Sequence, residues 1–394
     1  MNEVDLLVVG GGPAGAAVAA LAACSGKTTL VVERARFPRD KVCGEFLSAE
    51  GCRVLERLGV LERLLAAGAV WMEGCRITHP RGPRLDVALP ALGANGREAL
   101  GISRAKLDTE LLSVAAARGA EVLQPWEATR AVVEDDRVRG LKLREVGGEA
   151  TREVRAKLVV AADGRRSMLA RRLHPHLGDP RRSGPRSWFG LEVHLDAGGR
   201  RLASRIELHL FDGGYAGIGP VEEGRLNLGM IVNVATLRAC GGSPARLVER
   251  RLLTNPFLRE AIGDALPCSP WKSIGPLRFG PRRAAASGAL FVGDAAGTVD
   301  PFCGEGMANA LCGAELALPY VLDALGQGEL TDEIAARYEH AWRQAFGRVT
   351  RRVRRLGRLL ERPALARPVL SLLAGAGRGL APRLVASTRT DWSR

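Results

Sequence analysis

The feature that most constrains this chain is a glycine-rich turn between an apolar strand and a helix of small residues. Residues 5–9 read DLLVV, an apolar run with β-branched residues that favours a strand. They lead directly into GGGPAG at 10–15, and the alanine-rich residues 16–23 then predict a helix. A glycine cluster between a strand and a helix is typical of a dinucleotide-binding site.

Each residue of this turn has a specific expected role. Gly10 permits a tight turn, Gly12 lets the backbone approach a pyrophosphate, and Gly15 lets the helix pack closely on the strand. Pro13 and Ala14 open the helix, whose free N–H groups and positive end face the phosphates. We therefore expect these five residues to bind a dinucleotide.

A second strand supports the same site. Thr29–Val32 is apolar and ends in Glu33, roughly 20 residues after the glycines. A carboxylate at this distance accepts hydrogen bonds from a ribose diol and repels a 2′-phosphate. We include the adjacent Arg34 among the expected cofactor contacts.

Two later segments indicate which dinucleotide is bound. Residues 158–167 read LVVAADGRRS, a strand that ends at Asp163, and residues 289–297 read ALFVGDAAG, a strand that ends at Gly293 and Asp294. With the glycine turn, they resemble the FAD enzymes of the geranylgeranyl reductase and para-hydroxybenzoate hydroxylase superfamily, the class A flavin monooxygenases. The resemblance extends to about residue 345. It implies FAD as cofactor, with Asp294 at the ribityl chain and Asp163 near the pyrophosphate.

The resemblance implies further flavin contacts. Arg104 precedes a helix and would lie against the pyrophosphate, and the backbone of Ala128 would lie against adenine. Gly304, Gly306 and Met307 open another helix, expected to run to residue 318, at the edge of the flavin. A helix N-terminus there stabilises the negative charge that reduced flavin carries.

The loop at residues 39–48, RDKVCGEFLS, is the expected neighbour of the flavin ring. The resemblance places Cys43 and Gly44 beside the isoalloxazine. A nearby cation, Arg39 or Lys41, would lower the pKa of the Cys43 thiol and fit it for proton donation. The alternative is that Cys43 only packs, because cysteine is commonly a small buried apolar residue.

One stretch departs from the geranylgeranyl reductases, which resemble one another in a Tyr-x-Trp-x-Phe-Pro pattern. Here Tyr215 and Pro220 remain, but Gly217 and Gly219 replace both large aromatics. Each replacement would open about 100 Å³, since an aromatic side chain is large. This predicts a wide chamber for a bulky, ring-containing or carrier-tethered substrate, with Tyr215 as a second candidate proton donor. The Trp-x-Trp-x-Ile-Pro pattern of flavin halogenases is also missing, which argues against chlorination.

The predicted fold is α/β. We expect a three-layer FAD-binding Rossmann-like domain, an inserted antiparallel β-sheet that binds substrate, and a helical C-terminal tail. The expected segments are 1–75, 101–179 and 276–345 for the FAD domain, 76–100 and 180–275 for the sheet, and 346–394 for basic C-terminal helices.

The C-terminal tail leaves two interpretations open. Leu and Val recur at helical spacing among many arginines. The tail is either an amphipathic helix that touches a membrane or a set of helices that pack on the body with a solvated basic face. Residues 375–379, GAGRG, follow no strand and do not predict a nucleotide loop.

Composition limits the remaining classes. The 394 residues are 46% hydrophobic, enough for more than one domain, and no run approaches the roughly 18 apolar residues of a membrane span. The first strand begins at once, so we expect no signal peptide. Eight cysteines without CxxC spacing indicate neither a disulfide framework nor a metal site. These features favour a reduced, cytoplasmic protein.

The net charge of +14 raises the question of nucleic-acid binding. Arginines are scattered over all segments and aromatic content is only 5%, whereas single-strand binders depend on stacking. Nucleic acid is therefore not the expected partner. A general attraction for anionic substrates, phosphates or acidic carrier proteins is the better interpretation.

These observations predict an FAD-dependent oxidoreductase. The leading hypothesis is a monooxygenase that hydroxylates or epoxidises a bulky lipophilic or aromatic secondary metabolite. NAD(P)H would visit transiently as electron donor, because no second dinucleotide turn is found, and a small electron-carrier protein is the alternative donor. The alternative is a geranylgeranyl reductase-like double-bond reductase, with Cys43 or Tyr215 giving the proton. A flavin-binding protein without turnover is the third hypothesis.

Overall fold

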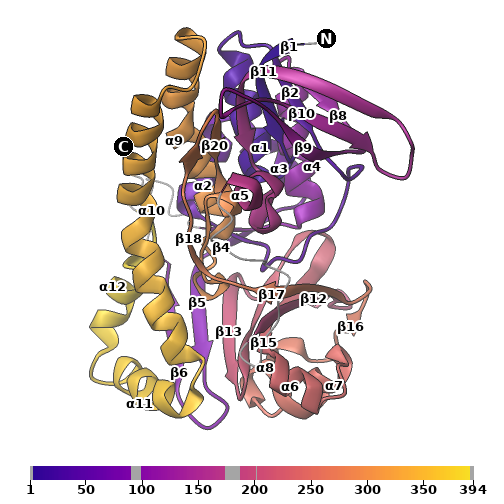
Figure 1. Ribbon diagram of the computed structural model, residues 1–394. Coiled ribbons are helices and arrows are strands. Elements are labelled where there is room, and N and C mark those ends of the chain that lie inside the picture. Colours follow the sequence, from indigo (N-terminus) through magenta and orange to yellow (C-terminus); the bar gives the residue numbers. More distant parts are fainter. Residues whose placement is uncertain (1–2, 90–98, 174–186, 201, 391–394) are drawn as a thin grey trace.

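The computed structural model describes residues 3–89, 99–173, 187–200 and 202–390. Two regions are stacked along a long C-terminal helix (Figure 1). One is built on a parallel sheet that includes the first strand of the chain, and the other on a second large sheet.

The parallel sheet is the core of the first region. Its central strand β1 (Glu3–Val9) pairs in parallel with β2 (Thr29–Val32) and β11 (Thr151–Ala161). β8 (Glu121–Leu123) and β20 (Ala289–Phe291) extend the parallel pairing at the two ends. β2, β20 and the C-terminal halves of β1 and β11 are buried, mostly apolar runs, because both faces of the sheet are covered there.

Helices cover one face of this sheet. α1 (Pro13–Cys24) packs against the strands and against both α4 (Arg104–Ala117) and α9 (Gly306–Gly326). The alanines of α1 let its neighbours approach closely, and nine of its twelve residues are buried. The ribbon of β9 (Trp126–Glu134) and β10 (Arg137–Glu145) continues antiparallel from β11.

The second sheet is the predicted insertion. Its strands are, in spatial order, β16 (Leu266–Pro267), β12 (Trp188–Asp196), β15 (Arg225–Asn233), β14 (Gly214–Pro220), β13 (Arg205–Phe211), β5 (Gly74–Thr78) and β6 (Arg84–Ala88), with β17 (Lys272–Leu277) beside β12. The described strand pairs of this sheet are antiparallel, as expected, except that β13 and β5 run parallel. They belong to separate chain segments, so no hairpin sets their direction.

The two faces of this sheet have different partners because side chains alternate along a strand. Ala216 and Ile218 of β14 face a core covered by α6 (Val234–Ala239), α7 (Pro244–Leu247) and α8 (Pro256–Ile262). The sequence analysis missed these three short helices. Tyr215 and Gly217 lie on the opposite face, which borders a large cavity.

The C-terminal tail folds into helices that pack on the body. α10 (Asp332–Leu360) runs along both regions, while α11 (Pro363–Ala374) and α12 (Ala381–Ala386) lie beside β6 (Figure 1). Their inner side chains share a core with the second sheet. No single helix in the described ranges is long and apolar enough to cross a membrane.

Smaller elements complete the fold. The remaining helices and strands are β3 (Phe46–Ser48), α2 (Ala49–Arg57), α3 (Leu61–Ala66), β4 (Val70–Met72), β7 (Ala99–Gly101), α5 (Met168–Leu173), β18 (Gly280–Pro281), β19 (Ala285–Ala286) and β21 (Gly297–Thr298). Short 3-10 or π turns lie between them. The fold is thus α/β with an inserted sheet and a helical C-terminal region, as predicted. Parts of two predicted boundaries, residues 90–98 and 174–186, lie outside the described residues, and the domain limits stay predictions.

Candidate active site

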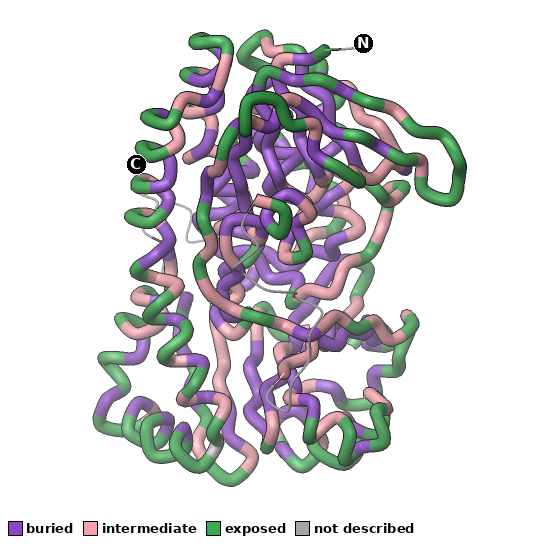
Figure 2. The backbone as a smooth tube through the Cα atoms, in the orientation of Figure 1, coloured by how far each residue is buried: buried purple, intermediate pink, exposed green. Residues whose placement is uncertain are grey.

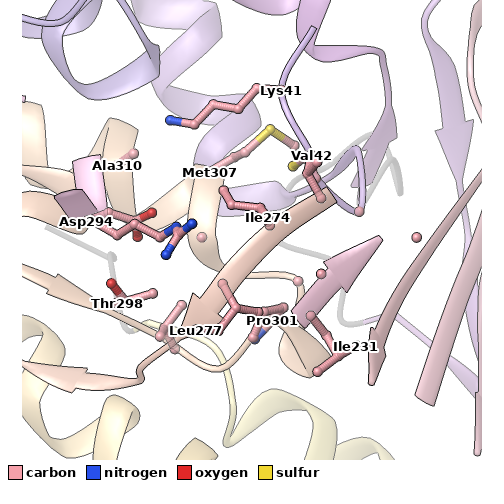
Figure 3. A pocket seen from close by; sticks show the side chains of 18 of the residues that line it. Lys41, Val42, Ile231, Ile274, Leu277, Asp294, Thr298, Pro301, Met307 and Ala310 are labelled. Atoms are coloured by element: carbon pink, nitrogen blue, oxygen red, sulfur yellow. The ribbon is translucent and has the colours of Figure 1, made fainter. Parts of the chain in front are cut away.

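A cavity of about 990 Å³ lies between the parallel sheet, the second sheet and the C-terminal helices. Every predicted site residue except Gly15 lines it, although those residues come from segments remote in sequence. They are Gly10, Gly12, Pro13, Ala14, Glu33, Arg34, Cys43, Gly44, Arg104, Ala128, Asp163, Tyr215, Gly293, Asp294, Gly304, Gly306 and Met307. Figure 3 shows part of this lining, with Lys41, Asp294 and Met307 around the same space.

The glycine turn has the geometry that the sequence predicted. Gly10 has φ +100°, and a Cβ there would lie 2.6 Å from the carbonyl oxygen of Ala162. A Cβ on Gly15 would lie 1.9 Å from the carbonyl oxygen of Gly10, so this glycine serves helix–strand packing and not the cavity. Gly12 is different, because its nearest neighbours would be the guanidinium ends of Arg39 and Arg104, at 3.7 and 3.8 Å. The backbone at Gly12 is open to a ligand.

Glu33 is held at the end of β2 by backbone groups. Its carboxylate accepts hydrogen bonds from the N–H groups of Gly11 at 2.7 Å and Ala35 at 2.8 Å, and the residue is only 5% exposed. These bonds fix the carboxylate beside the glycine turn. Each carboxylate oxygen has a second lone pair, which is the acceptor that a ribose diol requires.

Two arginines meet at the glycine turn. Arg104 makes a bidentate pair with Asp108, with N–O distances of 2.9 and 2.6 Å, and Arg39 reaches the same carboxylate at 2.7 Å. Asp108 is fully buried and keeps both guanidinium groups next to Gly12. Sequence reasoning found Arg104 but missed Asp108 as its positioning partner, although the i, i+4 spacing on α4 was a signal.

The carboxylates of Asp163 and Asp294 line the cavity together with several cationic side chains. One oxygen of Asp163 accepts a hydrogen bond from Met168 N–H at 2.8 Å, and the other has no partner within the described part of the chain. Burial raises the pKa of Asp163. Asp294 lies within electrostatic reach of Lys41 and Arg165.

Lys41 is a site residue that sequence reasoning missed as a cofactor contact. Burial lowers the pKa of its ammonium group and the nearby Arg104 lowers it further, while Asp294 opposes both. Its amine also lies close to Gly164. Lys41 is therefore a donor within reach of both later signature segments.

The loop that carries Cys43 is fixed from the second sheet. The N–H of Cys43 donates to Glu192 at 2.8 Å, and its carbonyl accepts from the Asn227 amide at 2.9 Å. The expected lowering of the thiol pKa is wrong. Burial raises the pKa of Cys43 and outweighs the opposing charge of Arg104, so the group remains a thiol.

A buried acid–histidine cluster lies behind this loop. His194 Nε2 lies 2.7 Å from Glu45 and 3.7 Å from Glu192. Burial and the charge of Glu45 raise the pKa of Glu192 to about 7. Burial alone would lower the pKa of His194, but the hydrogen bond to Glu45 raises it. Since the imidazole nitrogen bonds directly to Glu45, the cluster is a hydrogen-bonded support for the loop.

Tyr215 lines the cavity with its hydroxyl already engaged. The hydroxyl donates a hydrogen bond to Asp300 at 2.9 Å. Burial is the main cause that raises the pKa of Tyr215, and the charge of Asp300 raises it further. Asp300 in turn caps the Pro301 turn that precedes α9. The hydrogen bond from the Tyr215 hydroxyl therefore connects the second sheet to the turn before α9.

The structure has the expected extra space beside Gly217 but not beside Gly219. Gly217 lines the cavity, and a Cβ there would meet only the carbonyl oxygen of Gly229, at 3.9 Å. At Gly219, however, a Cβ would lie 2.9 Å from Ile206 and 3.1 Å from the methyl of Met72. Those side chains fill the space of the second missing aromatic, so only one of the two replacements widens the cavity.

The start of α9 is open towards the cavity. Gly304 has φ +71°, and a Cβ on Gly306 would meet no atom within 4 Å. Between them, Glu305 points away and pairs with Arg389 from the end of the tail. Burial raises the pKa of Glu305 to about 7. The first N–H groups of a 21-residue helix thus remain available to an acceptor.

Comparison with known proteins identifies the family. The model of the FAD binding domain family matches residues 3–353. The chain belongs to this family. Its curated relatives include digeranylgeranylglycerophospholipid reductase 2 of Methanopyrus kandleri, which is 30% identical over 88% of this chain and 84% of that protein. They also include menaquinone reductase of Mycobacterium tuberculosis, 30% identical over 100% of this chain and 93% of that protein.

Solved structures give the same fold. A geranylgeranyl bacteriochlorophyll reductase-like protein from Thermoplasma acidophilum matches with a TM-score of 0.77 and 21% identity, over 95% of this chain and 92% of that one. A myxobacterial chondrochloren halogenase matches with a TM-score of 0.78 and 22% identity, over 89% and 82%. The chain is an FAD-dependent oxidoreductase with reductase and monooxygenase relatives.

The residues present fit FAD. The exposed backbone at Gly12, two guanidinium groups and the N-terminus of α1 suit a pyrophosphate. The unpartnered oxygen of Asp163 and the cation Lys41 lie along the same cavity. The open N-terminus of α9 suits the electron-rich edge of the flavin ring. Glu33 at one end and Cys43 at the other would then bracket the cofactor.

Proposed function

We propose that this protein is an FAD-dependent reductase of carbon–carbon double bonds in a polyprenyl lipid. The observation that carries the proposal is the apolar arm of the cavity, the part enclosed by the second sheet and the C-terminal helices. It is lined by Ile77, Leu85, Leu208, Ile231 and Leu277 on the sheet side and by Leu356, Leu360, Leu370, Leu373 and Leu384 on the helix side. Burial of a branched aliphatic chain there gains about 0.8 kcal/mol per methylene.

The comparisons favour this reaction over oxygenation. The two curated relatives, each 30% identical, are named as reductases of a geranylgeranylated lipid and of menaquinone. The halogenase is only 22% identical, so its likeness extends to the fold alone. The cavity is also narrower than the one expected for a bulky ring-containing substrate, because Met72 and Ile206 fill the space at Gly219.

Reduction of a double bond adds two electrons and two protons, delivered as one hydride and one separate proton, and the separate proton comes from the protein. FAD, when bound and reduced, supplies the two electrons together with the other hydrogen, and NAD(P)H is the transient donor that we propose for the flavin. The chain must therefore hold a proton in the cavity wall beside the substrate. Cys43 and Tyr215 are the two candidate donors in that wall.

Cys43 is the better proton donor of the two. Its raised pKa keeps the sulfur protonated, and the nearby Arg104 stabilises the thiolate that donation leaves. Solvent then returns the proton. The Tyr215 proton is already committed to Asp300, so its release breaks a buried hydrogen bond. We assign proton donation to Cys43 and a structural role to the Tyr215 hydroxyl.

Replacing the thiol tests this assignment. We expect Cys43→Ala to lower kcat about 10²-fold, typical for the loss of a general acid, with FAD affinity unchanged. Cys75→Ala is the matched control, because Cys75 also lines the cavity but lies on β5 in its apolar arm. We expect Cys75→Ala to keep the wild-type kcat. If Cys43→Ala also keeps it, the Cys43 thiol is not the proton donor and only packs.

A monooxygenase is the second candidate, favoured by the open space at Gly217. The two reactions separate under strict anaerobiosis. The FAD-loaded protein is supplied with a reductant and either menaquinone or a geranylgeranylated glycerophospholipid, and the product is analysed by mass spectrometry. The proposal predicts a product that gains two hydrogens per turnover without O₂. A product that forms only with O₂ and carries an added oxygen atom would establish the monooxygenase instead.

A further inference from the structure

Exposed apolar side chains concentrate on α11 and on the turn that follows it. Seven large apolar side chains are exposed in the described ranges, and four of them lie within residues 365–380. These four are Leu365 at 51%, Val369 at 37%, Leu372 at 61% and Leu380 at 56% exposure, and we call them the α11 patch. The other three are scattered over distant strands and turns. A cluster of this kind marks an interaction surface.

The geometry of α11 explains why this patch is not used for packing. Ala366, Leu370 and Leu373 point inward and share a core with the second sheet. Leu365, Val369 and Leu372 follow one another at i, i+4 and i+7, so they form one stripe beside that inner face. The apolar surface of the helix is thus wider than the part that the body covers. Figure 2 shows that exposed and buried residues alternate along this part of the tail.

The surroundings of the patch are strongly basic. From Arg343 to Thr390 the chain carries twelve arginines, no lysine and a single acidic residue, Glu361. The exposed arginines nearest in sequence to the patch are Arg358, Arg362, Arg367, Arg378 and Arg383. An apolar stripe flanked by exposed arginines is complementary to an anionic lipid surface, with acyl chains below and phosphate headgroups around.

The shape of the tail favours a helix pair that lies on a bilayer. The segments Ala364–Ala374 and Arg378–Ala386 are together apolar enough for a span, but they are bent by 99°. A bend of this size, with one face of α11 packed on the body, suits insertion into the interface and not passage across the membrane.

The patch is continuous with the cavity. Val369 is both exposed and part of the cavity lining, and its neighbours Leu370 and Leu373 line the apolar arm from the inner face of α11. Leu384 and Val385 of α12 extend the same wall. Apolar surface therefore leads from the outside of α11 into the space beside the flavin site.

We propose that α11 and α12 dock on an anionic membrane surface and that lipid substrate enters the apolar arm beside α11. The second part rests on the proposed function, whereas the docking stands on the patch and its arginines alone. The bound surface would be the headgroup region of one leaflet, with the leucines of the α11 patch inserted.

Vesicle co-sedimentation of the full-length, FAD-loaded protein tests the docking. The probes are phosphatidylcholine vesicles with and without one-third phosphatidylglycerol. The test variant is Leu365→Glu with Leu372→Glu, two residues that do not line the cavity. The control is Leu266→Glu, which changes a leucine that is 70% exposed on β16, far along the chain from the tail. FAD content and circular dichroism verify that each variant is folded.

We expect the wild type and Leu266→Glu to sediment with the anionic vesicles, and the double variant to bind at least tenfold more weakly. Binding should also weaken as salt is raised, because the arginines contribute by charge. Docking is refuted if the wild type stays in the supernatant or if the double variant binds as the wild type does. Concentration-dependent dimerisation that the double variant abolishes, without vesicle binding, would instead assign the patch to a second copy. Vesicle binding without double-bond reduction would leave the docking intact and remove only the proposed function.

Discussion

Gly12 offers a test that separates cofactor binding from folding. It is the N-cap of α1 with φ −73° and ψ −176°, a conformation that alanine adopts without strain. A methyl group there would meet only two flexible guanidinium ends, at 3.7 and 3.8 Å. The protein without cofactor can therefore accommodate Gly12→Ala. The same methyl group would stand where the backbone must approach a pyrophosphate.

The two effects of this substitution differ in size. Alanine is a poorer N-cap than glycine, which costs about 0.5–1 kcal/mol of stability and lowers Tm by roughly 2 °C or less for a chain of this length. A displaced pyrophosphate loses or lengthens about two charge-assisted N–H hydrogen bonds, each contributing roughly 1.5–3 kcal/mol. We therefore expect FAD affinity to fall about 10²–10⁴-fold.

The assay compares flavin-stripped protein with and without added FAD. Thermal unfolding of the stripped protein reports the fold, and quenching of flavin fluorescence during titration reports Kd. Gly326→Ala is the matched control, because that glycine lies in α9 with no atom within 4 Å of its Cβ and does not line the cavity. FAD affinity of Gly12→Ala within threefold of the wild type would refute the assignment of this turn to the pyrophosphate.

Three further predictions follow from groups in and around the cavity. Because burial raises the pKa of Glu192 to about 7, the unfolded chain releases a proton between about pH 4.5 and 7 that the folded chain keeps. Stability from this group therefore falls as pH rises through that window, and Glu192→Gln should raise Tm relative to the wild type at pH 8 but not at pH 4.5. Equal differences at both pH values would contradict the shift. Arg389→Met leaves the buried carboxylate of Glu305 without its partner and should cost about 3–5 kcal/mol in urea unfolding at pH 8, whereas an unchanged midpoint would show that the pair contributes nothing. Gly217→Trp should fill the space beside Tyr215 and lower kcat/KM for a polyprenyl substrate at least tenfold with FAD affinity unchanged, and normal turnover would place the substrate elsewhere.

The parts of the fold with local signals could be predicted from the sequence. The strand–turn–helix at Gly10–Gly15 follows from steric requirements that glycine alone meets, and the structure shows them as Cβ clashes at Gly10 and Gly15. The alternation in β14 likewise separates Tyr215 and Gly217 from Ala216 and Ile218. Both patterns can be recognised from residues that are neighbours in the chain, although the atom that a Cβ on Gly10 would meet belongs to Ala162.

Features that depend on distant partners could not be predicted. The parallel pairing of β13 with β5 joins segments far apart in sequence, and no turn between them sets the register. The space at Gly219 is filled by Met72 and Ile206, whose positions no local pattern gives. The leucine spacing in α11 is compatible both with packing on the body and with membrane contact. Only the burial of individual residues shows that one face of the helix packs on the body while a neighbouring face is exposed.

The residues of the candidate site also separate into those with a local sequence signal and those whose roles depend on distant partners. Residues within the three signature segments line one cavity as expected, because each segment brings a short, recognisable turn to the same edge of the sheet. Lys41, Asp108 and Glu192 were missed as contributors, since their roles arise only when separate elements meet. The pKa of Cys43 was predicted in the wrong direction because its burial, invisible in the sequence, outweighs the nearby positive charge.

A crystal structure of the protein with FAD is the most direct test of a cofactor site shared by three chain segments. We predict density for one FAD per chain, with the pyrophosphate at the backbone of Gly12, the ribityl chain at Asp294 and the flavin ring between Gly44 and the start of α9. Density that places the pyrophosphate away from Gly12, or the flavin ring outside this cavity, would contradict the assignment of the site.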